Sequence, residues 1–341
     1  MSVDLRTRYL GLDLVSPIVA SSSPLTSEVA VVKQLEAAGA GAVILPSLFE
    51  EEILQEDLEL NRSLDAGTEQ FAEALGYFPA MGTQKGVGDR YLERLAKIKA
   101  SVAIPVIASL NAATTGGWVR YARLMQDAGA DALELNLYHV VADPSMTATD
   151  REETDLELIE AVRDAVTIPL AVKLSPYYSA LANFAGRAVA AGADGLVLFN
   201  RFYQPDLDLE TFDVLAKVAL SHPTELRMPL RWIAILRPQL GAGIGLGATT
   251  GVQTGIDAVK ALLVGADVAM VASAVLRNGP AEIGKIRDEM VAWMTEREYE
   301  SVTQLRSAAT SATVEDPTAF ERANYLAILH SWSTPASLVG G

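Results

Sequence analysis

The sequence predicts an α/β protein that folds as a TIM (β/α)8 barrel with additional C-terminal helices. Eight short apolar runs follow one another along the 341 residues, and helical patterns separate most of them. The runs lack strict alternation of apolar and polar residues, which is typical of strands buried on both faces. The main rival is an open, doubly wound sheet. The nucleotide-binding versions of that fold are disfavoured, because the chain contains no GxxxxGK[ST] motif and no GxGxxG motif after the first run.

The strands are expected at the apolar runs, and several of them follow a helix that ends in glycine. Glycine suits the left-handed conformation in which many helices end. The glycines Gly39, Gly129, Gly192 and Gly265 occupy this position in EAAGAGAVILPS, QDAGADALELNL, VAAGADGLVLFN and LLVGADVAMVAS. Two other runs open with Ile-Pro, and proline as the first residue of a strand loses no ladder hydrogen bond. The runs begin near Pro17, Ala42, Pro105, Ala132, Pro169, Gly195, Ile244 and Asp267.

One domain covering residues 1–341 is expected, because no low-complexity linker divides the chain. The segment from about 280 to 332 is predicted to form terminal helices, and residues 333–341 form a polar tail. The N-terminal MSVDLRTRYL has no apolar signal-peptide core, and no apolar run approaches the length needed to span a membrane. A cytoplasmic location is therefore expected.

Composition excludes several classes of site. Hydrophobic residues make up 50% of the chain and charged residues 21%, which supplies a large core and argues against disorder. The absence of cysteine excludes disulfides, iron–sulfur clusters and a cysteine nucleophile. A net charge of -16 repels phosphate backbones and anionic lipids, so we expect no nucleic-acid or membrane partner. The histidines are His139, His222 and His330, too few to favour a multi-histidine metal site.

Lys173 is the sharpest candidate for chemistry. Active sites of TIM barrels lie at the C-terminal ends of the strands, and Lys173 lies near the end of the strand PLAVKLSP. Buried lysines are rare unless paired, so we interpret it as a positive charge aimed at an anionic ligand or intermediate. The alternative is a lysine that reaches solvent at the rim. Glu134, which alternates with Asn136, is predicted to face the same way and pair with Lys173.

Two asparagines end neighbouring strands of the predicted barrel. Asn136 ends the fourth strand and Asn200 the sixth, and an amide can both donate and accept hydrogen bonds. With Lys173 on the fifth strand, these groups are expected to converge on one pocket, although each asparagine could instead cap a loop. The run ASSSPLT, from Ala20 to Thr26, ends the first strand and either lines the pocket or caps a helix.

A phosphate-binding turn is predicted after the seventh strand. Thr249, Thr250 and Gly251 stand between that strand and a helix, where backbone amides commonly bind phosphate in TIM barrels. Ala272 and Ser273, at the end of the eighth strand, would complete the phosphate site. A plain glycine-containing loop is the alternative.

At these residues the sequence resembles the dihydroorotate dehydrogenase family, in its soluble branch and in looser relatives. The resemblance spans about Leu5 to Pro280 and includes GLDLVSPIVASSS, LELNL, VKLSP, the strand-ending Asn200 and TTGVQTGIDAVKALLVGADVAMVAS. VKLSP and the last phrase are the more specific of these. The resemblance implies an FMN-dependent barrel, often a homodimer, that oxidises a dihydropyrimidine.

The resemblance also implies roles for single residues. Lys173 would stabilise the negative charge that builds near flavin N1 on reduction, and Asn136 and Asn200 would hold amides of flavin or substrate. A hydride would pass to flavin N5 while a loop residue removes a proton. The implied cofactor-binding residues are Ala20, Ser21, Ser22, Asn136, Lys173, Asn200, Thr250, Gly251, Ala272 and Ser273.

The catalytic base departs from the family pattern. Where the family has Asn-Leu-Ser-Cys-Pro-Asn, this chain reads Asn-Leu-Tyr-His-Val-Val from Asn136, which places His139 at the base position. Imidazoles titrate near roughly pH 6.5, so histidine suits this role, although it could also be a packing residue. Ser145, Thr147 and Thr149 on the same loop are other candidates.

Three further positions differ from the family. Pro46 replaces a flavin-site lysine, Glu73 replaces a substrate-binding asparagine, and Val141 replaces another. Sites built to hydrogen-bond a polar substrate lose affinity when partners are absent, and the Glu73 carboxylate would repel a substrate carboxylate unless paired or protonated. The implied substrate-binding residues are Asn136, Asn200 and Glu73. The positions implied to bind flavin match the family pattern better than the positions implied to bind substrate.

These residues lead to one main hypothesis and two alternatives. The main one is an FMN oxidoreductase acting on CH–CH bonds that converts dihydroorotate to orotate in pyrimidine biosynthesis, with Lys173 and His139 as catalytic residues. The first alternative keeps FMN but oxidises another dihydropyrimidine or a cyclic amide. The second is an inactive barrel that acts as a binding subunit. A homodimer is expected, and the electron acceptor is left open.

Overall fold

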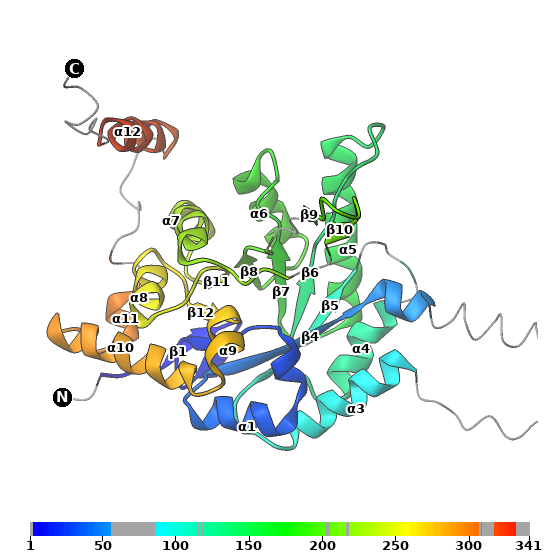
Figure 1. Ribbon diagram of the computed structural model, residues 1–341, viewed down its shortest axis with the longest axis horizontal. Helices are drawn as coiled ribbons and strands as arrows, with labels where there is room; N and C mark the ends of the chain where they lie inside the picture. The colour runs from blue at the N-terminus through cyan, green and yellow to red at the C-terminus, as the bar shows by residue number, and fades with distance from the viewer. Residues whose placement is uncertain are drawn as a thin grey trace, which may run out of the picture.

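The computed structural model describes residues 3–55, 86–112, 114, 116, 119–201, 205–215, 218–306, 308 and 317–331. A closed barrel of eight parallel strands lies at its centre (Figure 1). The predicted fold is confirmed, and every predicted apolar run contributes a strand. In order around the barrel these are β3 (Ile18–Ala20), β4 (Ala42–Phe49), β5 (Val106–Asn111), β6 (Ala132–Asn136), β7 (Leu170–Leu174), β8 (Gly195–Leu198), β11 (Gly245–Ala248) and β12 (Val268–Val271).

Helices surround the barrel, and those between its strands bury an apolar face against the outer side of the strands (Figure 1). The predicted helix ends are confirmed, since Gly39, Gly129, Gly192 and Gly265 all have positive φ. The helices between strands are α1 (Val29–Ala37), α3 (Val87–Lys99), α4 (Val119–Asp127), α5 (Ala148–Ala165), α6 (Leu181–Ala190), α7 (Arg227–Leu240) and α8 (Gly255–Leu263), with short 3-10 helices at Pro24–Ser27 and Pro223–Leu226.

The C-terminal part of the chain is helical, as predicted. After β12 follow α9 (Ser273–Asn278), α10 (Glu282–Glu296), α11 (Val302–Leu305) and α12 (Pro317–His330). The predicted polar tail, 333–341, lies outside the described residues. None of the described helices combines the length and the apolar character needed to cross a membrane.

A hairpin that the sequence analysis missed closes one end of the barrel. Strands β1 (Thr7–Tyr9) and β2 (Leu12–Leu14) pair antiparallel, and Tyr9 and Leu10 pack with the apolar barrel interior. A Cβ added to Gly195, the first residue of β8, would lie 2.5 Å from Cδ2 of Leu10. The hairpin therefore covers the end where strands begin, which leaves the C-terminal end for a site. A second missed hairpin, β9 (Asp206–Leu207) with β10 (Val214–Leu215), follows β8.

Candidate active site

Lys173 and Glu134 meet inside the barrel from neighbouring strands. Ala132 and Ala171, two residues earlier on β6 and β7, belong to the barrel interior, and strand alternation places Glu134 and Lys173 on the same side. Nζ of Lys173 lies 3.5 Å from Oε1 of Glu134, and only 1% of Glu134 is exposed. The predicted pairing is therefore present, and the carboxylate offsets the cost of burying an ammonium.

The two strand-ending asparagines contact each other beside this pair. Nδ2 of Asn200 donates to Oδ1 of Asn136, to the carbonyl of Leu137 at 3.1 Å and to the carbonyl of Lys173 at 3.4 Å. Among the described residues, Nδ2 of Asn136 and Oδ1 of Asn200 have no protein partner. One amide donor and one amide acceptor thus remain for a ligand at the ends of β6 and β8.

A cavity of about 130 Å³ lies at the C-terminal ends of the strands, beside Lys173. Its lining brings together most of the residues implied to bind the cofactor, while Ala20 is the buried last residue of β3 just before them. The charged groups in the described lining are the cations Lys173 and Arg201, and that lining contains no carboxylate. The lining residues are Ser21, Ser22, Lys173, Phe199, Arg201, Ser221, Thr249, Thr250, Gly251, Val252, Met270, Ala272 and Ser273.

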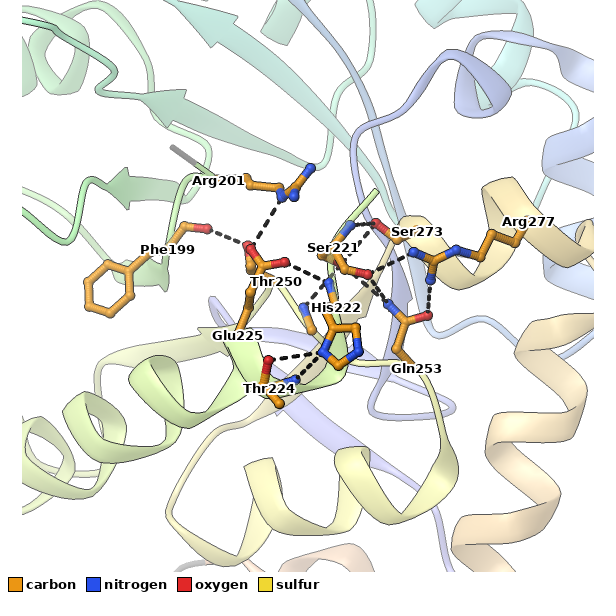
Figure 2. A network of polar contacts seen from close by, with 11 residues as sticks. Phe199, Arg201, Ser221, His222, Thr224, Glu225, Thr250, Gln253, Ser273 and Arg277 are labelled. Carbon is orange, nitrogen blue, oxygen red and sulfur yellow. Dashed lines mark hydrogen bonds and ion pairs between the residues drawn. The ribbon is translucent and has the colours of Figure 1, made fainter. Parts of the chain in front are cut away.

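The turn after β11 is held in a conformation that is costly for a non-glycine residue. Thr250 has φ 71° and Gly251 has φ 89°. Oγ1 of Thr250 donates to the carbonyl of Phe199 at 3.1 Å, which ties the turn to the end of β8 (Figure 2). A Cβ at Gly251 would lie 2.4 Å from the backbone nitrogen of Leu226. Glycine is therefore required here by close approach of the backbone as well as by φ.

Ser221 connects this turn to α9, as Figure 2 shows. Its hydroxyl lies 2.9 Å from Oγ of Ser273, and its backbone nitrogen donates to the same atom at 3.0 Å. Nε2 of Gln253 donates to the Ser221 hydroxyl at 3.2 Å. Arg277 donates to the Ser221 carbonyl at 2.9 Å and to Oε1 of Gln253 at 2.7 Å. The sequence analysis missed Ser221, because the segment between β8 and α7 carries no recognisable pattern.

Arg201 is held in place by Glu225. Nε of Arg201 lies 3.3 Å from Oε2 of Glu225, whose other oxygen accepts from the backbone nitrogen of His222 at 2.6 Å (Figure 2). Sequence reasoning also missed Arg201, although its position directly after the strand-ending Asn200 was a usable signal.

His139 lies in a different cavity. It lines a space of about 430 Å³ beside α5, which shares no lining residue with the cavity at Lys173. Nε2 of His139 is 3.0 Å from Oδ1 of the buried Asp155, although the two atoms are not aligned as a hydrogen bond. The structure therefore brings Lys173, Asn136 and Asn200 together, whereas His139 lines the cavity beside α5 together with Leu137, whose carbonyl accepts from Asn200.

The alternative bases on the loop have other contacts. Ser145 is exposed and donates to Oδ1 of Asp143 at 2.7 Å. Thr147 is the N-cap residue of α5 and accepts from the backbone nitrogen of Asp150 at 3.1 Å, and Thr149 is exposed.

The three positions that depart from the family pattern are spread over the chain. Pro46 lies in β4, where the pairing with β5 shifts register, and Val141 lines the larger cavity. Glu73 lies outside the described residues. In the described part of the chain no cluster of histidine and acidic side chains could hold a metal ion.

Comparison with known proteins places this site in a family. A sequence model described as Dihydroorotate dehydrogenase matches residues 4–294. The chain is 26% identical over 312 residues to a protein of Thermoplasma acidophilum named dihydroorotate dehydrogenase B (NAD(+)), catalytic subunit, covering 90% of this chain and 99% of that protein. Proteins with the same name from Geobacter sulfurreducens (26% identity, 89% and 98% coverage) and Listeria monocytogenes (29%, 70% and 79%) also match. Because the family model matches well over half of this chain, the chain belongs to the dihydroorotate dehydrogenase family.

Proposed function

We propose that this chain is an FMN-dependent dehydrogenase that oxidises dihydroorotate to orotate in pyrimidine biosynthesis. The observation that carries the proposal is the cavity at the strand ends. In a chain with net charge -16, its described lining holds Lys173 and Arg201, several hydroxyl groups and no carboxylate. Such a lining suits an anionic group such as a phosphate. The names of the relatives support dihydroorotate as the substrate.

The donors of this cavity fit an FMN phosphate. The turn at Thr250 and Gly251 and the residues Ala272 and Ser273 would hold the phosphate, and Arg201 would offset its charge. A volume of about 130 Å³ is smaller than that of typical small-molecule sites, so the described walls would enclose only one end of a flavin. The hydride acceptor of the reaction would be supplied by bound FMN.

The chain's own side chains would stabilise developing charge, orient the substrate and accept a proton. Lys173 would place its ammonium where negative charge develops, since Glu134 holds it at the mouth of the barrel. The free amide donor of Asn136 and acceptor of Asn200 would orient a cyclic amide. Oxidation of a CH–CH bond removes one hydride and one proton. We keep His139 as the proposed acceptor of the proton, with Ser145, Thr147 and Thr149 as alternatives.

The electrons would leave through a second protein. The relatives are named catalytic subunits of NAD(+)-dependent enzymes, and this chain has no cysteine to hold an iron–sulfur cluster. We therefore infer that a separate electron-transfer subunit carries electrons from the flavin to NAD(+). Assembly as a homodimer stays a prediction.

An anaerobic titration of the purified, FMN-loaded protein with dihydroorotate tests the proposal. Bleaching of the visible flavin band is the expected result, because the substrate then reduces the cofactor. A yellow protein that dihydroorotate does not bleach would contradict dihydroorotate as the substrate. A protein that takes up no added FMN would contradict the flavin site itself.

A further inference from the structure

Two polar atoms buried inside the barrel have no hydrogen-bond partner among the described residues. They are the hydroxyl oxygen of Tyr9, the last residue of β1, and Oε2 of Glu134 on β6. Both residues are only 1% exposed. Burying a polar group without a hydrogen bond destabilises a fold, so such groups in native proteins normally bind another group or an ordered water. The two atoms therefore require a partner that the chain itself does not supply.

Glycines on β11 make room for the Tyr9 ring inside the barrel. A Cβ added to Gly245 would lie 3.1 Å from Cδ2 and Cε2 of Tyr9, and one added to Gly247 would lie 3.4 Å from its hydroxyl oxygen. The ring therefore runs along β11, from the covered end of the barrel toward the cavity. Gly247 pairs in register with Val197, and Val197 pairs with Lys173. The Tyr9 hydroxyl thus lies beside the row of strand partners to which Lys173 belongs.

Tyr9 lies close enough to Glu134 for the carboxylate charge to act on its hydroxyl. Burial, followed by the charge of Glu134, raises the pKa of the Tyr9 hydroxyl well above its ordinary value. Tyr9 therefore keeps its proton at neutral pH and remains a hydrogen-bond donor. The two unpartnered atoms are not in direct hydrogen-bond contact. One water molecule between them would satisfy both, because it can accept from the hydroxyl and donate to Oε2.

A second buried tyrosine near Glu134 has its hydroxyl bonded elsewhere. Burial raises the pKa of Tyr91 on α3, and the charge of Glu134 adds a smaller contribution in the same direction. The Tyr91 hydroxyl donates to the carbonyl of Ser109 at 3.3 Å and accepts from its backbone nitrogen at 3.0 Å. The donor of Tyr91 is thus already used, whereas the donor of Tyr9 is left for Glu134.

Glu134 uses its other carboxylate oxygen to hold Lys173. Oε1 lies 3.5 Å from Nζ of Lys173, whose side chain lines the cavity at the strand ends. We propose that Tyr9 is a positioning residue, which holds Glu134, and through it Lys173, by way of one water molecule bound inside the barrel. With both oxygens bonded, the carboxylate has a fixed orientation and so fixes the ammonium. This inference deepens the proposed function, on which the role of Lys173 toward FMN rests.

Chemical denaturation of the full-length Tyr9→Phe protein tests the water bridge without flavin or substrate. We expect the equilibrium constant for unfolding to rise about tenfold, because Glu134 loses the water that Tyr9 holds. If the Tyr9 hydroxyl had no partner, the same substitution would leave stability unchanged or increase it, since the cost of burying that hydroxyl would disappear. An unchanged or more stable Tyr9→Phe protein would therefore overturn the proposal.

A double-mutant cycle assigns the effect to Glu134. In a Glu134→Gln background, Tyr9→Phe should change the unfolding equilibrium constant by only about twofold, because the charged acceptor is gone. Tyr91→Phe removes an equally enclosed hydroxyl that is bonded to Ser109, so as the control it should have the same effect in both backgrounds. Equal effects of Tyr9→Phe in the two backgrounds would contradict a bridge to Glu134.

The redox equilibrium of the FMN-loaded protein tests the positioning of Lys173. A less firmly held ammonium stabilises the reduced cofactor less, so at a fixed potential the ratio of reduced to oxidised FMN should fall at least about threefold in Tyr9→Phe. Spectroelectrochemical titration measures this ratio, which Tyr91→Phe should leave at the wild-type value. A wild-type ratio in Tyr9→Phe would overturn the positioning role. A protein that takes up no FMN would contradict the proposed flavin site, whereas the denaturation cycle would still decide whether Tyr9 holds Glu134.

Discussion

The ammonium of Lys173 lies 3.5 Å from Oε1 of Glu134, and this pair links the barrel interior to the cavity at the strand ends. Glu134 is fully enclosed, whereas Lys173 lines the cavity. The carboxylate thus holds a positive charge at the place where an anionic ligand would arrive. The contact with Glu134 fixes the direction of the Lys173 side chain, whereas a lysine side chain at the solvent-exposed rim would have no fixed direction.

Replacing this lysine should stop the reductive half-reaction. Lys173→Ala removes the charge that would stabilise the reduced cofactor, so flavin reduction by dihydroorotate should slow by at least about a hundredfold. Anaerobic stopped-flow spectroscopy of the flavin band measures the rate, with the exposed Lys97→Ala as the control. A Lys173→Ala protein that is reduced at the normal rate would remove this lysine from the mechanism.

Replacing His139 should slow reduction without emptying the flavin site. His139 lines a different cavity from the proposed phosphate-binding residues, so His139→Ala should retain FMN while losing about a hundredfold or more in rate. His330→Ala, which changes an exposed imidazole on α12, serves as the control and should be reduced at the wild-type rate. If the rate of His139→Ala equals that of wild type, the base lies elsewhere or no base is used.

A methyl group at Gly251 should disrupt the proposed phosphate site. Gly251→Ala would place Cβ 2.4 Å from the Leu226 nitrogen at a φ of 89°, so the turn must move. FMN affinity should fall by about tenfold or more, as measured by fluorescence titration, because the displaced turn lines the cavity. Gly243→Ala meets nothing within 4 Å and should bind FMN normally. Equal affinities for the two variants would exclude this turn from the phosphate site.

A buried ion pair at the opposite end of the barrel should control stability. Arg237 donates from Nη2 to Oδ2 of Asp267 at 2.6 Å, and from Nε to the Gly265 carbonyl at 2.7 Å. Arg237→Leu leaves the buried Asp267 carboxylate with Arg306 and the Leu246 backbone nitrogen as partners, so the free energy of unfolding should fall by about 1–3 kcal/mol. Chemical denaturation measures this change. Arg6→Ala, which breaks an exposed pair with Asp4, should leave the denaturation midpoint unchanged. A similar change in the denaturation midpoint of both variants would contradict a special contribution of Arg237 to stability.

Tyr178 should make the fold sensitive to alkaline pH. Burial, followed by the charge of Asp155, raises the pKa of the Tyr178 hydroxyl far above its ordinary value of about 10. The folded state therefore holds this proton more tightly than the unfolded state. Its contribution to stability is complete below about pH 10 and is lost as pH rises above that value.

The comparison of Tyr178→Phe with wild type isolates this effect. The variant should show a smaller loss of unfolding free energy between pH 9 and 11, measured by urea denaturation at each pH, while its ring still stacks on Phe184. Tyr177→Phe, at the exposed neighbouring position, should follow the wild-type profile. An unchanged slope in Tyr178→Phe would show that other groups carry the alkaline sensitivity.

Sequence patterns were sufficient for the barrel because its determinants are local. The glycines after the helices and the apolar runs depend on conformations and burial that neighbouring residues specify, so every strand of the barrel was predicted. The hairpin β1–β2 was missed because its short strands contain the charged residues Arg8 and Asp13 and so form no apolar run. Strand alternation also predicted the pairing of Glu134 with Lys173, since the register of two parallel neighbours follows from the barrel.

The sequence by itself determined the fold, the family resemblance and the polar residues at the strand ends. Only the tertiary structure brought Ser221 and Arg201 to the cavity and turned His139 toward Asp155 on α5. The physical reason is that strand-end residues are positioned by the regular hydrogen bonding of the barrel, whereas loop side chains are positioned by contacts with partners distant in sequence. Those contacts combine Coulomb attraction, burial and hydrogen bonding between separate segments, which a single linear pattern does not encode.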